Sequence, residues 1–343
     1  MITIRDVARR AGVSTATVSY VLNQKRRVSQ DIAARVQAAV AALNYIPSGT
    51  ARKLKRGRSG IIGFVADNIA NRCPSRVVQG LTAAAAIHGY SVLISDLHDA
   101  PETEPRALEL LMREQVEGLV YCGFGTIEDQ LIGIHRSGTP VVVVDKPPRG
   151  KILPSVLVDN ARSTELALKH LLALGHRQIR FISGDPINRN TLLRNEAFRK
   201  FCRKHRLPFA HHHILMGSYS IQHGYAGASR LLEEDAGFTA VFCGDDMIAF
   251  GAMAGFRSRG LRIPEDIAVA GFANDPLAGV VDPGLTTIHY PMVDMGRQAF
   301  ELFLALRDKN NRPVLHERLP TQLIIRRSTD PSQPWYAHSE VEP

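Results

Sequence analysis

Small, hydrogen-bonding side chains are concentrated near the start of the chain, between Ser14 and Asn23. In a helix they occupy the face opposite the apolar Val18, Val21 and Leu22. Such a face suits the major groove of DNA, where base edges offer hydrogen-bond donors, acceptors and the thymine methyl group. The chemistry that we expect is therefore recognition of bases and phosphates. The polar face comprises Thr15, Ala16, Thr17, Ser19, Tyr20 and Asn23.

Two short helices and a turn must position this face. Thr3 and Asp6 predict a capped start for the first helix, and Gly12 supplies the positive φ at which helices often stop. Ser14 and Ser29 are the expected caps of a second and a third helix. The pattern also occurs in helical bundles that do not bind DNA, so it leaves both interpretations open. The expected core consists of Ile4, Val7, Ala8, Ala11, Val18, Val21, Leu22, Ile32, Val36, Ala39, Val40 and Leu43.

Positive charge is confined to one end of the chain, which has 343 residues and a formal net charge of +9. Residues 1–60 contain twelve Lys or Arg and two acidic residues, whereas the rest contains thirty bases and thirty-one acids. This asymmetry is typical of a polyanion-binding module attached to a near-neutral domain. A membrane surface is the other class of partner, but the basic end lacks a lipid-facing stripe with Trp or Phe.

A short basic stretch, residues 47–60, follows the predicted bundle and contains one large apolar residue, Leu54. One interpretation is a flexible linker. The other is a segment that folds on DNA, with its charges on phosphates and Leu54 wedged into the minor groove.

From Ile61 onward, short apolar runs alternate with helical patterns, in two similar series. The alternation predicts two doubly wound, parallel-sheet α/β subdomains. Open parallel sheets bind ligands beyond the carboxyl ends of their strands. We therefore expect a small-molecule site in the cleft between the two halves.

Several other functions find no support in the sequence. No secretion signal or apolar run long enough to span a membrane is present, so we expect a cytoplasmic protein. No nucleotide-binding, hydrolase or zinc-protease motif occurs. We expect no catalytic residue, no metal and no cofactor: His211–His213 are expected at the surface, and Asp245 and Asp246 at a helix start. The four cysteines, far apart and expected to be reduced thiols, are Cys73, Cys122, Cys202 and Cys243.

Motifs along nearly the whole chain, from Ile2 to Ser328, resemble the LacI/GalR family of bacterial transcription repressors. The resemblance implies a helix-turn-helix headpiece, a hinge helix and a core similar to periplasmic sugar-binding proteins. It also implies a homodimer, or a tetramer built from dimers, on a pseudo-palindromic operator, with an effector in the core cleft. The motifs are residues 3–23, Asn44-Tyr45-x-Pro47, Ala51-Arg52-x-Leu54, Gly175-His176-Arg177, 239–242, 264–267, Gly271-Phe272 and 283–287.

The implied boundaries place the headpiece at residues 1–46, the hinge helix and linker at 47–60, the core at 61–328 and a tail at 329–343. Within the core, one subdomain is expected to span about 61–158 and 288–320, and the other about 159–287 and 321–328. No leucine-zipper heptad follows Ser328, which favours a dimer over a tail-mediated tetramer.

The resemblance also assigns residues to the DNA interface. Thr15, Ala16 and Tyr20 fall at positions that read bases, and Leu54 at the position that wedges into the central base step. Ala16 is too short to hydrogen-bond a base, so it can contact only a thymine methyl. The full expected set is Thr3, Ser14, Thr15, Ala16, Thr17, Ser19, Tyr20, Asn23, Arg27, Ser29, Tyr45, Ala51, Leu54 and Lys55.

In the core, Arg194 matches the arginine that grips the ligand in this family, and Tyr219 a ring that can stack on it. Ala273 stands where the family normally has Asp, so either a neighbouring residue substitutes or the ligand differs. We expect an anionic sugar-type effector, bound by Arg194 and other cations; alternatively, Lys146 and Arg189 are solvated surface charges. The full expected set is Asn68, Asp145, Lys146, Arg189, Arg194, Tyr219, Asp246, Asn274 and Asp275.

The function that we expect is therefore a DNA-binding transcriptional repressor controlled by a small polar effector, which either induces or co-represses. A solute-binding module without DNA regulation is the alternative. A sugar-metabolising enzyme is a third candidate, but no catalytic constellation supports it.

Overall fold

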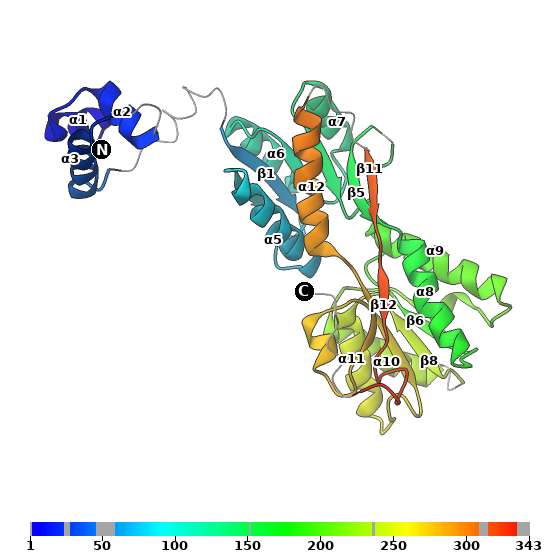
Figure 1. Ribbon diagram of the computed structural model, residues 1–343. Helices are drawn as coiled ribbons and strands as arrows, with labels where there is room; N and C mark the ends of the chain where they lie inside the picture. Colours follow the sequence, from blue (N-terminus) through cyan, green and yellow to red (C-terminus); the bar gives the residue numbers. More distant parts are fainter. Residues whose placement is uncertain are drawn as a thin grey trace. The chain divides into compact units, whose positions relative to one another are not determined.

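The computed structural model describes residues 2–23, 28–45, 59–150, 152–234, 237–308 and 315–334. They belong to two compact units, a headpiece within residues 1–60 and a core within residues 61–343, each considered by itself (Figure 1). Most of the expected hinge lies outside the described residues. So do four residues expected to contact DNA, namely Arg27, Ala51, Leu54 and Lys55.

The headpiece contains three helices, α1 (Ile4–Ala11), α2 (Thr15–Asn23) and α3 (Gln30–Ala42). Their apolar faces meet in a small core, as the helical spacing predicts. Tyr45, which follows α3, also belongs to this core. The buried members are Val7, Ala8, Ala11, Val18, Val36, Ala39 and Tyr45, with Ile4, Val13, Val21, Leu22, Ile32, Val40 and Leu43 packed against them.

Local capping contacts fix the ends of these helices. The Asp6 carboxylate accepts hydrogen bonds from the backbone N–H and the hydroxyl of Thr3, at 2.9 and 2.7 Å. Gly12 ends α1 with φ +64°, which glycine adopts without steric cost. Ser14 and Ser29 each accept a hydrogen bond from the N–H three residues later, at 3.1 and 3.5 Å. The predicted caps are therefore confirmed.

The first sheet of the core has six parallel strands in the order β11-β5-β4-β3-β1-β2. Helices α5 and α12 pack against one face of this sheet, and α6 and α7 against the other. The bounds are β1 Ile61–Ala66, α5 Arg72–Ile87, β2 Ser91–Asp96, α6 Glu104–Arg113, β3 Leu119–Cys122, α7 Glu128–Arg136, β4 Val141–Val144, β5 Ser155–Val158, α12 Met292–Arg307 and β11 His316–Leu319, with a 3₁₀ turn at Pro101–Thr103.

The second sheet has the order β12-β10-β9-β8-β6-β7, and β12 is antiparallel to β10 while the other pairs are parallel. Helices α8 and α9 cover one face, and α10 and α11 the other (Figure 1). The bounds are α8 Asn160–Ala173, β6 Ile179–Ile182, α9 Arg189–Lys204, β7 Ile214–Leu215, α10 Ile221–Glu234, β8 Ala240–Cys243, α11 Asp246–Arg257, β9 Ala268–Ala273, β10 Thr286–His289 and β12 Gln322–Ile324, with 3₁₀ turns at His211–His213 and Pro276–Gly279.

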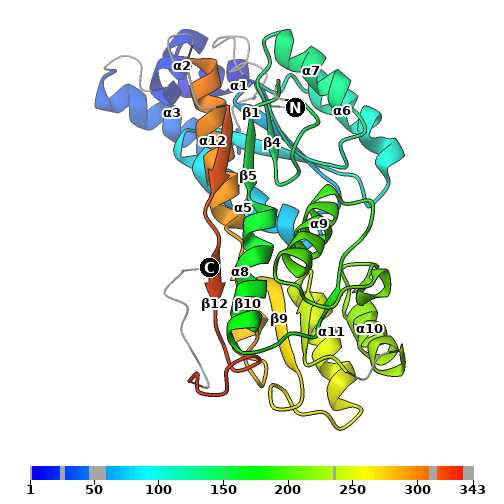
Figure 2. The ribbon, with the colours of Figure 1, turned by 90° about the vertical axis from the view of Figure 1, so that its right-hand side faces the viewer.

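Each sheet with its helices forms one subdomain, here called the first and the second subdomain. The described chain crosses between them after β5, after β10 and after β11 (Figure 2). Because β10 continues to His289, the second crossing follows that residue, close to the boundary expected at about 287/288. The architecture is the doubly wound, two-subdomain fold that the sequence predicts.

Two further features of the core bear on the sequence-based expectations. His211–His213 form a 3₁₀ turn, and His213 is buried, with its Nδ1 accepting the Ala210 N–H at 3.1 Å. The expectation of three surface histidines was therefore wrong for His213. Among the described residues, no helix combines the length and the apolar character that crossing a membrane requires.

Candidate functional sites

The exposed face of the headpiece lies on α2. Thr15 and Ala16 are exposed, whereas Thr17, Ser19 and Tyr20 are half-buried. The hydroxyl of Ser14 hydrogen-bonds to that of Thr17 at 2.9 Å while it caps the helix. Thr15 and Ala16 are thus the side chains most open to base edges. The hydroxyls of Ser14 and Thr17 lie at the helix end that favours anions such as phosphate.

Two expected DNA contacts have another role in the headpiece. Tyr45 is only 9% exposed, because its ring packs in the core beneath the helices. The hydroxyl of Thr3 donates to Asp6 and so serves the cap of α1. Ser29 remains exposed at the start of α3.

Arg35 is a residue that the sequence analysis missed. Its Nη2 donates to the carbonyl oxygens of Ala11 and Gly12, at 2.6 and 3.3 Å, and its Nη1 lies 3.7 Å from Asp31. These carbonyls lie at the end of α1, where helical acceptors have no partner within the helix. Arg35 therefore ties α3 to the turn that sets the direction of α2.

The core encloses a cavity of about 320 Å³ between the carboxyl ends of the two sheets. This is where open parallel sheets bind ligands. The first subdomain contributes Asp67, Ala70, Asn71, Arg72, Cys73, Pro74, Cys122, Asp145 and Lys146, and the second Asn188, Asn190, Arg194, Tyr219, Asp245, Met247, Phe272 and Ala273; Tyr290 and Met292, which follow the second crossing, complete the wall.

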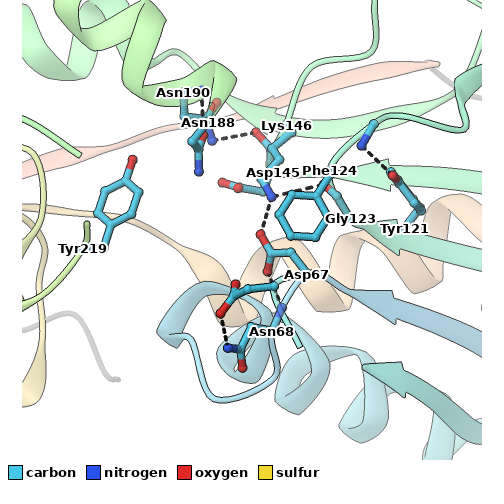
Figure 3. Close-up of polar contacts among 12 residues, drawn as sticks. Asp67, Asn68, Tyr121, Gly123, Phe124, Asp145, Lys146, Asn188, Asn190 and Tyr219 are labelled. Atoms are coloured by element: carbon cyan, nitrogen blue, oxygen red, sulfur yellow. Dashed lines mark hydrogen bonds and ion pairs between the residues drawn. The ribbon is translucent and has the colours of Figure 1, made fainter. Parts of the chain in front are cut away.

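Lys146 is held in an ion pair on the wall of the first subdomain (Figure 3). Its ammonium donates to the Asp67 carboxylate and, at 3.1 Å, to the carbonyl of Gly123. It also lies 5.4 Å from the centre of the Phe124 ring. Burial, the largest single effect, lowers the pKa of Lys146, but the charges of Asp67, Cys122 and Asp145 and the hydrogen bond to Asp67 together outweigh burial and hold that pKa above its ordinary value. Lys146 therefore remains charged and paired.

Arg194 is fixed in position from several sides. Its Nε donates to Asn160 Oδ1 at 2.8 Å and its Nη1 to the carbonyl of Gly244 at 2.7 Å. The guanidinium stacks 3.8 Å from the centre of the Phe272 ring. Its Nη2 has no hydrogen-bond partner within the described part of the chain and is available to a ligand in the cavity.

Acidic groups of α11 approach the cavity from the second subdomain. Asp245 lines the wall and caps the helix by accepting the Met247 N–H at 2.8 Å. Burial, and then the charge of Asp246, raise the pKa of Asp245 to about 7. Burial raises the pKa of Asp246 to about 6. The sequence pointed to the position of Asp245 without assigning it to the effector site.

The structure places four of the nine expected effector residues on the cavity wall, namely Asp145, Lys146, Arg194 and Tyr219. The other five lie off the wall and are engaged elsewhere. Asn68 donates to Asp99, Arg189 to the carbonyl of Pro147, Asp246 accepts from Thr287 and from the Asp275 N–H, Asn274 accepts from Arg326, and Asp275 pairs with Arg72.

Backbone geometry explains why Asn274, which follows Ala273, does not place its side chain on the cavity wall. Ala273 and Asn274 have φ of +131° and +54°, so the chain turns sharply at the end of β9. Ala273 keeps its place on the wall, while the turn directs Asn274 towards Arg326 at 3.0 Å. Hydrogen-bonding groups at the wall of the second subdomain come instead from Asp245, Asn188 and Asn190.

Polar contacts link the two subdomains around the cavity. Arg72, at the start of α5, forms an ion pair with Asp275 and donates to the carbonyl of Asn274 at 3.1 Å. On the other side, the amide of Asn190 donates to the carbonyl of Asp145 at 3.3 Å. The relative position of the subdomains therefore depends on groups beside the ligand site.

Two of the four cysteines also meet at the cavity, contrary to the expectation from their spacing. Cys73, in the first turn of α5, and Cys122, the last residue of β3, both line the wall. Their separation in the sequence hides this proximity. The rule that functional groups follow the carboxyl ends of parallel strands does point to Asp67, Cys122 and Asp145.

Comparison with known proteins finds a match both for the headpiece and for the core. Residues 3–48 match the family of bacterial regulatory proteins, lacI family, and residues 168–329 match the periplasmic binding protein-like domain. The chain is 33% identical over 332 residues to the HTH-type transcriptional repressor PurR of Vibrio cholerae serotype O1, covering 96% of this chain and 98% of that protein. It is 30% identical over 331 residues to catabolite control protein A of Priestia megaterium, covering 96% and 99%.

A solved structure shows the same similarity in three dimensions. The crystal structure of the lac repressor dimer bound to operator and the anti-inducer ONPF matches with a TM-score of 0.85 and 29% sequence identity. The match covers 96% of this chain and 99% of that one.

Proposed function

The chain belongs to the lacI family of bacterial regulatory proteins, and from this membership we propose that it represses transcription by binding operator DNA as a homodimer, under the control of a small polar effector. The observation that carries this proposal is the presence in one chain of a helix-turn-helix headpiece and a ligand-sized cavity. A solute-binding module would not require a helix-turn-helix headpiece. The relatives found by comparison are named as regulators and not as enzymes.

The exposed side chains of α2 are the proposed reading surface. Thr15 can hydrogen-bond to a base edge, and Ala16 can contact only a thymine methyl. Tyr20 supplies a ring and a hydroxyl beside them. Paired headpieces of a dimer would place two such surfaces in successive major grooves of a pseudo-palindromic site.

The charges on the cavity wall favour a neutral sugar-type effector over the anionic one expected from the sequence. Three cations, Arg72, Lys146 and Arg194, share the wall with the carboxyl groups of Asp67, Asp145 and Asp245. Two of those cations are already paired with carboxylates. A few polar groups among aromatic and apolar ones are typical of a site that orients a small ligand by hydrogen bonds.

Selection of bound DNA from a random pool by the full-length protein tests the regulatory role. We expect enrichment of a two-fold symmetric site, and deletion of residues 1–60 should abolish this binding while ligand binding and dimerisation persist. Recovery of unrelated sequences at fixed salt would instead favour the solute-binding alternative.

Calorimetry with neutral sugars, sugar acids and sugar phosphates tests the effector class. Neutral sugars should bind, and at about a hundred times Kd a ligand adds about 2.7 kcal/mol to the free energy of unfolding. Binding of the acids or phosphates alone would restore the anionic interpretation.

A further inference from the structure

Two thiols and a carboxylate meet on the cavity wall of the first subdomain. They come from the first turn of α5 (Cys73), the end of β3 (Cys122) and the residue after β4 (Asp145). The two Sγ atoms and a carboxylate oxygen all lie within 4.8 Å of one another. All three residues line the same cavity. The fold therefore brings together a donor set that the spacing in the sequence does not reveal.

We propose that Cys73, Cys122 and Asp145 form a binding site for a thiophilic divalent cation, of the class of Zn²⁺ or Cd²⁺, with a fourth position open to the cavity. Three protein ligands and one open position are the arrangement of zinc sites that also accept an exogenous ligand. Thiolates favour such cations over Mg²⁺ or Ca²⁺, which prefer oxygen donors.

The carboxylate of the site is positioned by its surroundings. Asp145 is 6% exposed and has φ +71°, in the left-handed region that residues other than glycine seldom adopt. Its Oδ1 accepts a hydrogen bond from the Tyr290 hydroxyl at 2.6 Å, which holds the carboxylate in one orientation. Metal-ligating carboxylates are commonly oriented by outer hydrogen bonds of this kind.

A bound cation would offset most of the negative charge of its ligands. Two thiolates and one carboxylate carry three negative charges, so a divalent cation leaves one. The ammonium of Lys146 also interacts electrostatically with Cys122 and Asp145, although its main partner is the Asp67 carboxylate. On binding, the cation forms two bonds to sulfur, and each thiol releases its proton to solvent.

Titration of the reduced, full-length protein with Cd²⁺ tests this site without DNA or effector. We expect one Cd²⁺ per protomer and the ultraviolet absorption that marks charge transfer from thiolate to cadmium. Histidines do not produce this absorption. Cys73→Ser and Cys122→Ser should abolish it, whereas Cys202→Ser and Cys243→Ser, at the two other cysteines, should retain it. Tyr290→Phe should weaken Cd²⁺ binding by about tenfold to a hundredfold.

The wild-type protein provides a second test that does not depend on the folding of variants. Zn²⁺ should protect Cys73, the partly exposed member of the pair, from alkylation by iodoacetamide, as measured by peptide mass spectrometry, and Mg²⁺ should not. Absence of the charge-transfer absorption, its persistence in Cys73→Ser, or equal alkylation with and without Zn²⁺ would overturn the proposal. Each outcome is independent of operator binding.

Discussion

The buried carboxyl group of Asp245 makes stability depend on pH at the level of a single residue. Burial and the nearby Asp246 raise its pKa from 3.8 to about 7. Between these two values the folded protein holds a proton that the unfolded chain has lost. The stabilisation from this group is therefore complete below about pH 4 and is lost as the pH rises towards 7, by up to about 1.4 kcal/mol per pH unit.

We predict that Asp245→Asn flattens this dependence and raises the free energy of unfolding near pH 8. Asn caps a helix as well as Asp does, so the contact with the Met247 N–H should survive. Asp246, with a pKa of about 6, continues to titrate and leaves part of the slope. Urea unfolding at a series of pH values measures the effect.

Asp266→Asn is the matched control. That exposed carboxyl group accepts hydrogen bonds from Arg262, which lower its pKa to about 2. Its removal should change the pH dependence only in acid, with the opposite sign. An unchanged slope between about pH 5 and pH 7 in Asp245→Asn would contradict the assignment.

The guanidinium of Arg194 forms two hydrogen bonds within the protein and has a third nitrogen available to a ligand. Lysine keeps the charge but cannot hold Asn160, the Gly244 carbonyl and a ligand together. Arg194→Lys should weaken effector binding by about tenfold to a hundredfold, the value of one hydrogen bond from a charged donor. Calorimetry measures it, with Arg203→Lys, at an exposed position on the same helix, as the control. Equal losses in both variants would place the ligand away from the cavity wall.

At the scale of elements, the contact of α3 with the end of α1 determines how α2 is presented. Arg35→Ala removes the donor to two carbonyls that otherwise have no helical partner. Because the side chain is half-exposed, we expect a loss of about 1 kcal/mol in headpiece stability. Faster amide hydrogen exchange at Val13 and a lower melting temperature would show it.

The exposed Arg10, on α1, provides the control for this prediction. Arg10→Ala removes the same charge from the headpiece without touching the turn. If both variants lower the melting temperature equally, the effect is one of net charge, and the role assigned to Arg35 is wrong.

Helices and strands could be predicted from the sequence, because apolar spacing and capping residues are local patterns. Apolar spacing and the caps at Ser14 and Ser29 define the headpiece helices, and the alternation of strands and helices defines the core. Contacts between distant elements were not predictable, because periodicity carries no information about which ends meet. Arg35 at Ala11 and Cys73 beside Cys122 are of this kind. Asn274 lies off the cavity wall for another reason, namely the positive φ that turns its side chain away from the cavity.

At the scale of the whole core, coupling between effector and DNA requires that the two subdomains change their relative position. The ion pair of Arg72 with Asp275 joins α5 of the first subdomain to the loop after β9 of the second. Its side chains are only 19% and 14% exposed, so water screens it less than a surface pair. The pair therefore favours the closed arrangement that surrounds the cavity.

We predict that Asp275→Asn weakens effector binding by up to about tenfold, because part of the binding energy must then close the subdomains. Asn retains an oxygen for the Leu277 N–H, so the turn after β9 should persist. The effector changes operator affinity by a certain factor, and that factor depends on how much of the protein is in the closed state. Asp275→Asn should therefore change this factor as well. Calorimetry and gel-shift titration measure the two quantities on the same preparation.

Asp294→Asn is the control for closure, because it breaks an exposed pair with Arg297 that lies within α12. It should leave both quantities unchanged. An Asp275→Asn protein with wild-type effector affinity and wild-type coupling would mean that the pair does not bias closure. The contact of Asn190 with the Asp145 carbonyl would then be the next candidate, since it joins the subdomains on the other side of the cavity.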